Sequence, residues 1–165
     1  MSILGVLALL VTLLAPGVAL ACSCMWAGPF TRVALRTDLV LLAEVLHYHR
    51  HGMDVAVLDV LKGREERRVI RVWGDTGALC RPYVAGFPRG TRWIFAVQRA
   101  RGPEAVDDYA ISVCGEYWLE ARGDRAVGRI AVAEHDPSLE SAPLADVLAW
   151  VRSGGATPLA STTPR

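Results

Sequence analysis

Apolar and polar residues alternate in short runs along much of the chain, and this is the period of β-strands. The clearest run covers residues 38–50. Its alternate apolar positions, which would share one face of a strand, are Leu39, Leu41, Ala43 and Val45. A turn is expected at residues 51–54. Further strand-like runs lie at residues 55–61, 69–73, 93–97 and 109–113, with one more candidate at 125–133. Because Gly, Pro and Asp clusters separate these runs, the pattern predicts an all-β meander or barrel.

One segment near the C-terminus has the helical period instead. Its apolar residues follow the spacing i, i+3, i+4, i+7 and are Leu144, Val147, Leu148 and Val151. Pro143 suits the start of such a helix, and Gly154 suits its end. A shorter helix is expected at residues 29–35. The predicted fold class is therefore all-β with flanking helices.

The first 21 residues differ from the rest of the chain. Residues 3–20 form one apolar run, and Ala19 and Ala21 supply the small residues of a cleavage site. The pattern predicts a signal peptide at 1–21, one domain at 22–153 and a flexible tail at 154–165. A retained N-terminal anchor helix is the alternative reading. The expected localisation is secreted, extracellular or periplasmic.

Charge and motifs narrow the function classes. The formal net charge is +1, with both signs interspersed, so the basic footprint of a nucleic-acid-binding protein is absent. The sequence contains no His-Glu-x-x-His, Gly-x-Ser-x-Gly or phosphate-loop motif. We therefore expect neither an enzyme nor a resident cofactor.

Four cysteines lie after the apolar run: Cys22, Cys24, Cys80 and Cys114. Export together with an even count predicts two disulfides, for which four cysteines allow three connectivities. A bridge between Cys22 and Cys24 would close a strained small ring. Each of these two cysteines is therefore expected to pair with either Cys80 or Cys114.

Cleavage after Ala21 would make Cys22 the first residue of the mature chain. Its free α-amine and its carbonyl oxygen could then chelate a zinc ion whose fourth position is open, as in a catalytic zinc site. Ser23 would point into the adjoining specificity pocket. Two alternatives stay open: the cysteines serve only as structural staples, or Cys22 is lipidated, which would block the amine and attach the chain to a membrane.

The histidines of the first predicted hairpin suggest a second kind of site. His47, His49 and His51 alternate, so on a strand they would share one face and could bind copper or zinc. A hairpin tip on which the three imidazoles are simply exposed to solvent is the alternative.

Several segments of the chain together carry a resemblance to a known family. They are Cys-Ser-Cys at 22–24, the runs at 38–45 and 57–63, Cys80 with the segments 87–90 and 93–96, and the run 109–114 that ends in Cys114. This set resembles the tissue inhibitors of metalloproteinases and the wider netrin-like domain family, in particular its short bacterial members. The chain departs from the inhibitors at Trp26, in the segment that follows the second cysteine.

The resemblance implies a five-stranded OB-like closed β-barrel with disulfides Cys22–Cys80 and Cys24–Cys114. It also implies a function, namely inhibition of a zinc metalloprotease by the mature N-terminus. The inhibitory contact residues would be Cys22 on the zinc, Ser23, Cys24, Met25, Ala78 and Leu79. The alternative is a non-catalytic extracellular binding or structural module with the same fold.

Overall fold

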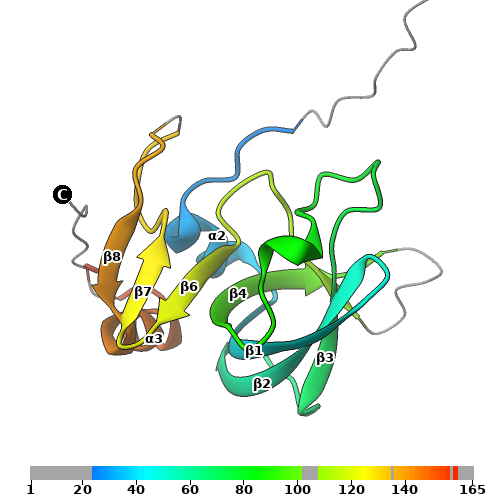
Figure 1. The fold of residues 1–165 in the computed structure, drawn as a ribbon. Helices are drawn as coiled ribbons and strands as arrows, with labels where there is room; N and C mark the ends of the chain where they lie inside the picture. The colour runs from blue at the N-terminus through cyan, green and yellow to red at the C-terminus, as the bar shows by residue number, and fades with distance from the viewer. Residues whose placement is uncertain (1–23, 102–107, 135, 157, 160–165) are drawn as a thin grey trace, which may run out of the picture.

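The computed structural model describes residues 24–101, 108–134, 136–156 and 158–159. These residues form a β-barrel, a small sheet that continues from one of its strands, and two flanking helices (Figure 1). The helices are α2 (Phe30–Arg36) and α3 (Leu144–Arg152), and a 3-10 turn covers Val84–Gly86. The strands are β1 (Leu39–His49), β2 (Gly52–Lys62), β3 (Val69–Trp73), β4 (Arg92–Arg99), β5 (Tyr109–Ala110), β6 (Trp118–Arg122), β7 (Arg125–Gly128) and β8 (Glu140–Pro143).

Five of these strands close the barrel. Their order is β1-β2-β3-β5-β4, and β4 returns to pair with β1. All of these pairings are antiparallel except β3 with β5, which is parallel. This arrangement confirms the OB-like five-stranded closed barrel expected from the sequence, and closure leaves the barrel without an open edge.

β1 is long because it pairs with β2 along its whole length and with β4 along its first half. Register shifts within the β1–β2 pairing bend it around the barrel. The four residues expected on one face, Leu39, Leu41, Ala43 and Val45, are all buried, as predicted. After Val45 the strand leaves the core, and its last four side chains are exposed.

A second sheet extends from the barrel through β4, β6, β7 and β8, all antiparallel. In Figure 1 this sheet lies to one side of the barrel, with α3 beneath it. The apolar stripe of α3 is confirmed, because Val147 and Val151 are buried while Leu144 and Leu148 pack against the core. α3 thereby covers the apolar face that the added strands would otherwise expose.

Two predicted strands are shorter than expected, and two strands were not predicted as such. The run at 109–113 is strand only at Tyr109–Ala110, because the amide of Val113 is hydrogen-bonded to the carbonyl of Cys80 instead. The run at 125–133 ends at Gly128, after which the Arg129 and Ile130 carbonyls accept hydrogen bonds from the start of α2. β6 and β8 are only five and four residues long, too short for their patterns to indicate strands, and they form by pairing with β4 and β7.

The first hairpin turns earlier than predicted. The turn expected at 51–54 lies at Arg50 and His51, and β2 already begins at Gly52. Met53 is fully buried, which favours strand pairing over a turn. The helix expected at 29–35 is confirmed as α2, shifted by one residue. The predicted signal peptide lies outside the described residues, as do residues 160–165 of the predicted tail.

Candidate functional site

Cysteine sulfurs gather at one end of the barrel. Cys24 and Cys114 form a disulfide that joins residues 90 positions apart. Cys80 is also disulfide-bonded, and its Sγ lies within 4.8 Å of the other two sulfurs. Because sulfurs held in disulfides are not thiolates, this cluster is not a metal site. Cys22 and Ser23 both lie outside the described part of the chain. The expected disulfide Cys22–Cys80 therefore stays a prediction.

Backbone hydrogen bonds hold the N-terminal segment against the loop that carries Cys114. The amide of Ala27 donates to the carbonyl of Cys114 over 2.6 Å, and the amide of Glu116 donates to the carbonyl of Gly28 over 3.0 Å. These two bonds run in opposite directions between the same segments. Together with the Cys24–Cys114 disulfide, these bonds hold the segment that begins at Cys24 in place.

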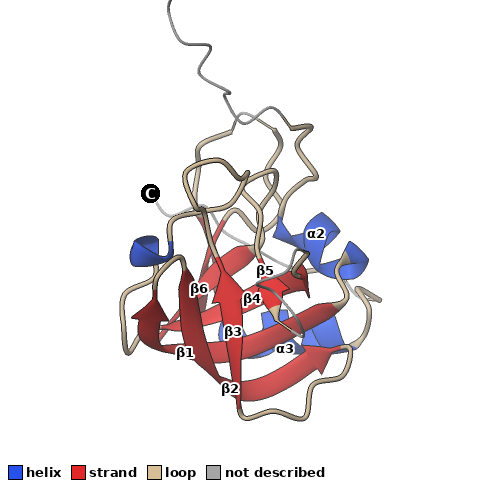
Figure 2. Cartoon of the chain, turned by 90° about the vertical axis from the view of Figure 1, so that its right-hand side faces the viewer, coloured by secondary structure: helices blue, strands red, loops and turns tan. Residues whose placement is uncertain are grey.

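The same end of the barrel carries the loop that follows β3. The carbonyl of Cys80 accepts hydrogen bonds from the amide of Val113 (3.1 Å) and the hydroxyl of Ser112 (3.1 Å). Earlier in the loop, the Asp75 carboxylate accepts a hydrogen bond from the Leu79 amide (2.8 Å), and this bond lowers the pKa of Asp75. In Figure 2 the connecting loops collect at this end of the molecule.

Exposed apolar side chains flank the sulfur cluster. Met25 is 92% exposed, Val113 45% and Leu79 41%. Each is next in sequence to a cysteine of the cluster, so the three lie around it although they come from three distant parts of the chain. We call Met25, Leu79 and Val113 the cysteine edge. Ala78, another predicted contact residue, is also exposed. Val113 was missed by sequence reasoning, because its run was expected to be strand.

The three histidines are not brought together as a metal site. Among the described residues, the three cysteines form the only group of three or more His, Cys, Asp or Glu residues with closely spaced ligand atoms. His47 pairs across the hairpin with Asp54 (Nε2 to Oδ2, 3.0 Å), whereas His49 and His51 line a pocket at the hairpin tip. Asp54 was expected in the turn and is instead a strand residue opposite His47.

Trp26 belongs to a network that the sequence did not indicate. The guanidinium of Arg129 lies 5.6 Å from the Trp26 ring centroid and donates a hydrogen bond to Glu116 (2.5 Å). Burial raises the pKa of Glu116, and Arg129 opposes that shift. The indole Nε1 of Trp26 is buried with no hydrogen-bond partner in the described structure. Trp26 is therefore partly buried and packs against Arg129.

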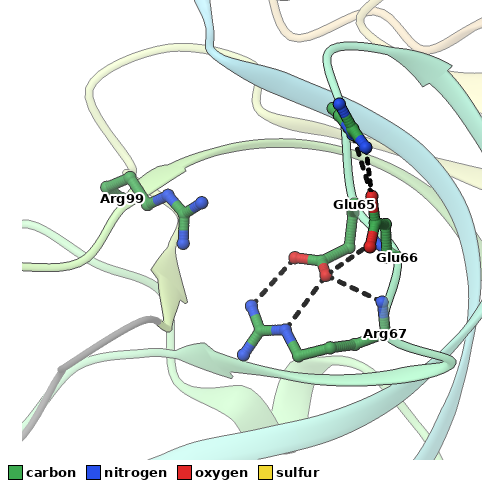
Figure 3. A pocket seen from close by; sticks show the side chains of 5 residues that line it. Glu65, Glu66, Arg67 and Arg99 are labelled. Atoms are coloured by element: carbon green, nitrogen blue, oxygen red, sulfur yellow. Dashed lines mark hydrogen bonds and ion pairs between the residues drawn. The ribbon is translucent and has the colours of Figure 1, made fainter.

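A polar pocket of about 410 Å³ opens on the barrel wall between the β2–β3 loop and Arg99 (Figure 3). Glu65 accepts hydrogen bonds there from the Arg67 guanidinium (3.0 and 2.8 Å) and from the Tyr109 hydroxyl (2.8 Å). Arg67 above all lowers the pKa of Glu65 to about 2. A carboxylate that accepts this many hydrogen bonds is a poor proton acceptor. The contacts of Glu65 are therefore structural and connect the β2–β3 loop to Tyr109 on β5.

Comparison of the sequence with protein-family models and with curated proteins gives no match. Within the part of the chain that the structure describes, no helix has both the length and the apolar character needed to cross a membrane.

Proposed function

We propose that the chain inhibits a zinc metalloprotease outside the cytoplasm, with the cysteine edge as its contact surface. In this proposal the mature chain begins at Cys22, whose α-amine and carbonyl oxygen chelate the catalytic zinc of the target in place of its bound water. Ser23 enters the adjoining pocket of the protease. Met25, Ala78 and Leu79 contact the rim of the active-site cleft.

The observation that carries the proposal is the position of the cysteine edge. A chelating terminus needs a rigid support close to its first residue, because a freely moving end would lose conformational entropy on binding. The disulfide Cys24–Cys114 and the hydrogen bonds at Ala27 and Gly28 supply such a support two residues from Cys22.

The exposed apolar side chains support an interface at this end. Disulfides that served only as staples would not need Met25, Leu79 and Val113 to be exposed around them. Clustered apolar side chains with a polar surround are typical of protein–protein contact surfaces. The disulfide also favours an oxidising compartment, which agrees with export of the chain.

The test is inhibition of a panel of purified zinc endopeptidases by the mature protein, measured with fluorogenic peptide substrates. Leu79→Glu should raise the inhibition constant at least about tenfold, because it buries a charge against the cleft rim. The matched control is Leu58→Glu, which changes a leucine of similar exposure (48%) on β2.

Equal inhibition by the two variants would reject the cysteine edge as the contact surface. No inhibition of any panel member by the unaltered protein would reject the inhibitor proposal. The same barrel would then be a non-catalytic extracellular binding or structural module.

A further inference from the structure

A pocket at the tip of the β1–β2 hairpin is lined by basic side chains and by no acidic one. It measures about 530 Å³ and is formed by the hairpin turn, β3 and the loop after β3. Its lining residues are His49, Arg50, His51, Arg71, Trp73 and Thr76. No acidic residue is among them, whereas the pocket in Figure 3 has two glutamates beside its arginines.

Arg71 is held in a fixed orientation at this pocket. Its Nε and Nη2 atoms donate to the two carboxylate oxygens of Asp54, over 2.7 and 3.0 Å. Its guanidinium also lies 5.9 Å from the ring centroid of Trp73. The remaining nitrogen, Nη1, makes no hydrogen bond to the described residues. Because Asp54 and Trp73 already hold the guanidinium in place, Arg71 would lose little further rotamer freedom on donating hydrogen bonds to a ligand.

Two glycines keep the pocket in shape. A Cβ at Gly52 would come within 3.2 Å of the Arg71 side chain, so the glycine gives that side chain room to cross the hairpin. The amide of Gly74 donates to the carbonyl of His51 over 2.8 Å, and a Cβ at Gly74 would lie 2.4 Å from the carbonyl oxygen of Pro82. The hairpin tip and the loop after β3 are therefore tied together.

The hairpin turn itself contains an unfavourable residue. Arg50 has φ of 55°, and it is the only residue other than glycine with positive φ among those described. Glycine is the usual choice for such a position, because an L side chain there is strained. The imidazoles of His49 and His51 flank it, and no hydrogen bond to the described residues engages either one. The turn thus presents three basic side chains at the cost of local strain, a pattern typical of functional sites.

We propose that this hairpin pocket binds a tetrahedral oxyanion, either free sulfate or phosphate or the same group as an ester on a small molecule. Charge complementarity supports this proposal, because Arg50, Arg71 and the two histidines line the pocket and no carboxylate is among its lining residues. Arginine donors match the oxygens of such anions in bidentate fashion. The Thr76 hydroxyl can donate a further hydrogen bond. The site is independent of the inhibitor proposal.

The experiment is an NMR titration of the ¹⁵N-labelled protein with sodium sulfate at constant ionic strength, with chloride as the balancing salt. We expect saturable shifts of amides in the turn and at Thr76. Arg50→Gly should weaken sulfate binding at least about threefold, since it removes one charge, while the protein stays as stable because the strain is relieved. The double variant His49→Gln/His51→Gln should also weaken sulfate binding, because both imidazoles line the pocket. Arg36→Gln, at the end of α2, is the matched control.

Parallel titrations with inorganic phosphate and with glucose 6-sulfate separate the sources of the anion. Tighter binding of the ester than of sulfate supports an ester ligand, and equal binding supports the free anion. Shifts that do not saturate, or that are the same in Arg50→Gly and Arg36→Gln, would overturn the proposal. A weaker Arg50→Gly variant that has also lost stability would overturn it as well, because the arginine would then be structural.

Discussion

At the scale of single residues, Glu65 is a buried carboxylate whose ion pair has a defined pH signature. Its side chain is 6% exposed, and its pKa falls from an ordinary 4.5 to about 2, chiefly through Arg67. Because the folded-state pKa is lowered, the stabilisation is complete above pH ~4.5 and is lost as the pH falls toward 2. At about 1.4 kcal/mol for each pH unit, this fall of the pKa from 4.5 to about 2 corresponds to at most about 3 to 4 kcal/mol.

We expect Glu65→Gln to flatten the pH dependence of stability. The free energy of unfolding, measured in urea at several values between pH 2 and 7, should fall less steeply with acid in the variant than in the unaltered protein. Glu66→Gln is the matched control, because the Glu66 side chain is 73% exposed and, among the described residues, its carboxylate pairs with Arg64 alone. Identical pH profiles for Glu65→Gln and the unaltered protein would contradict the account.

Gly63 occupies a position that no other residue fits. Its φ is +82°, and a Cβ there would lie 2.3 Å from the carbonyl oxygen of Asp38. We expect Gly63→Ala to lower the free energy of unfolding by more than about 2 kcal/mol, from backbone strain and steric clash together. Gly123→Ala supplies the comparison, because Gly123 also has positive φ (+61°) but faces open space. Equal losses in the two variants would show that the clash relaxes freely.

At the scale of elements, a lysine from β2 caps the end of α2. The ammonium of Lys62 donates hydrogen bonds to the carbonyls of Ala34 (3.1 Å), Leu35 (2.7 Å) and Thr37 (2.7 Å). These are carbonyls that a helix end leaves without partners, and a cation there also opposes the helix dipole. Lys62 thus joins the helix to the barrel.

Lys62→Met should cost about 1–3 kcal/mol of stability and loosen α2 before the rest of the fold. Hydrogen exchange followed by NMR would show faster exchange at the last turn of α2 than in β1. Arg36→Met removes the other cation of that turn, which makes no hydrogen bond in the described structure, and should leave exchange nearly unchanged. Uniform acceleration across the barrel in Lys62→Met would contradict a local cap.

Elements with a repeated period could be predicted from the sequence, and those set by distant partners could not. The alternation in β1 and the helical stripe of α3 each bury one face, so the pattern reveals them. β6 and β8 exist because β4 and β7 pair with them. The run at 109–113 reads as strand, but Cys80 and the disulfide of Cys114 draw its second half away from the sheet.

At the scale of the whole molecule, closing the barrel brings distant loops to one end. Cys24, Cys80 and Cys114 could be predicted as disulfide cysteines from their number, but their closeness to exposed Met25, Leu79 and Val113 depends on the fold. The hairpin pocket was likewise beyond sequence reasoning, because Arg71 and Thr76 reach it from β3 and the following loop. Periodicity predicts faces of elements, whereas sites are formed by the way those elements meet.

The central claim is that the cysteine edge supports a terminus that grips a target's zinc. Its most direct test compares two forms of the protein against one sensitive zinc protease. One form begins at Cys22, as verified by intact mass, and the other carries one extra alanine before Cys22. The account predicts that the extra residue, which turns the α-amine into an amide, raises the inhibition constant by at least about a hundredfold. Equal inhibition by both forms would contradict it.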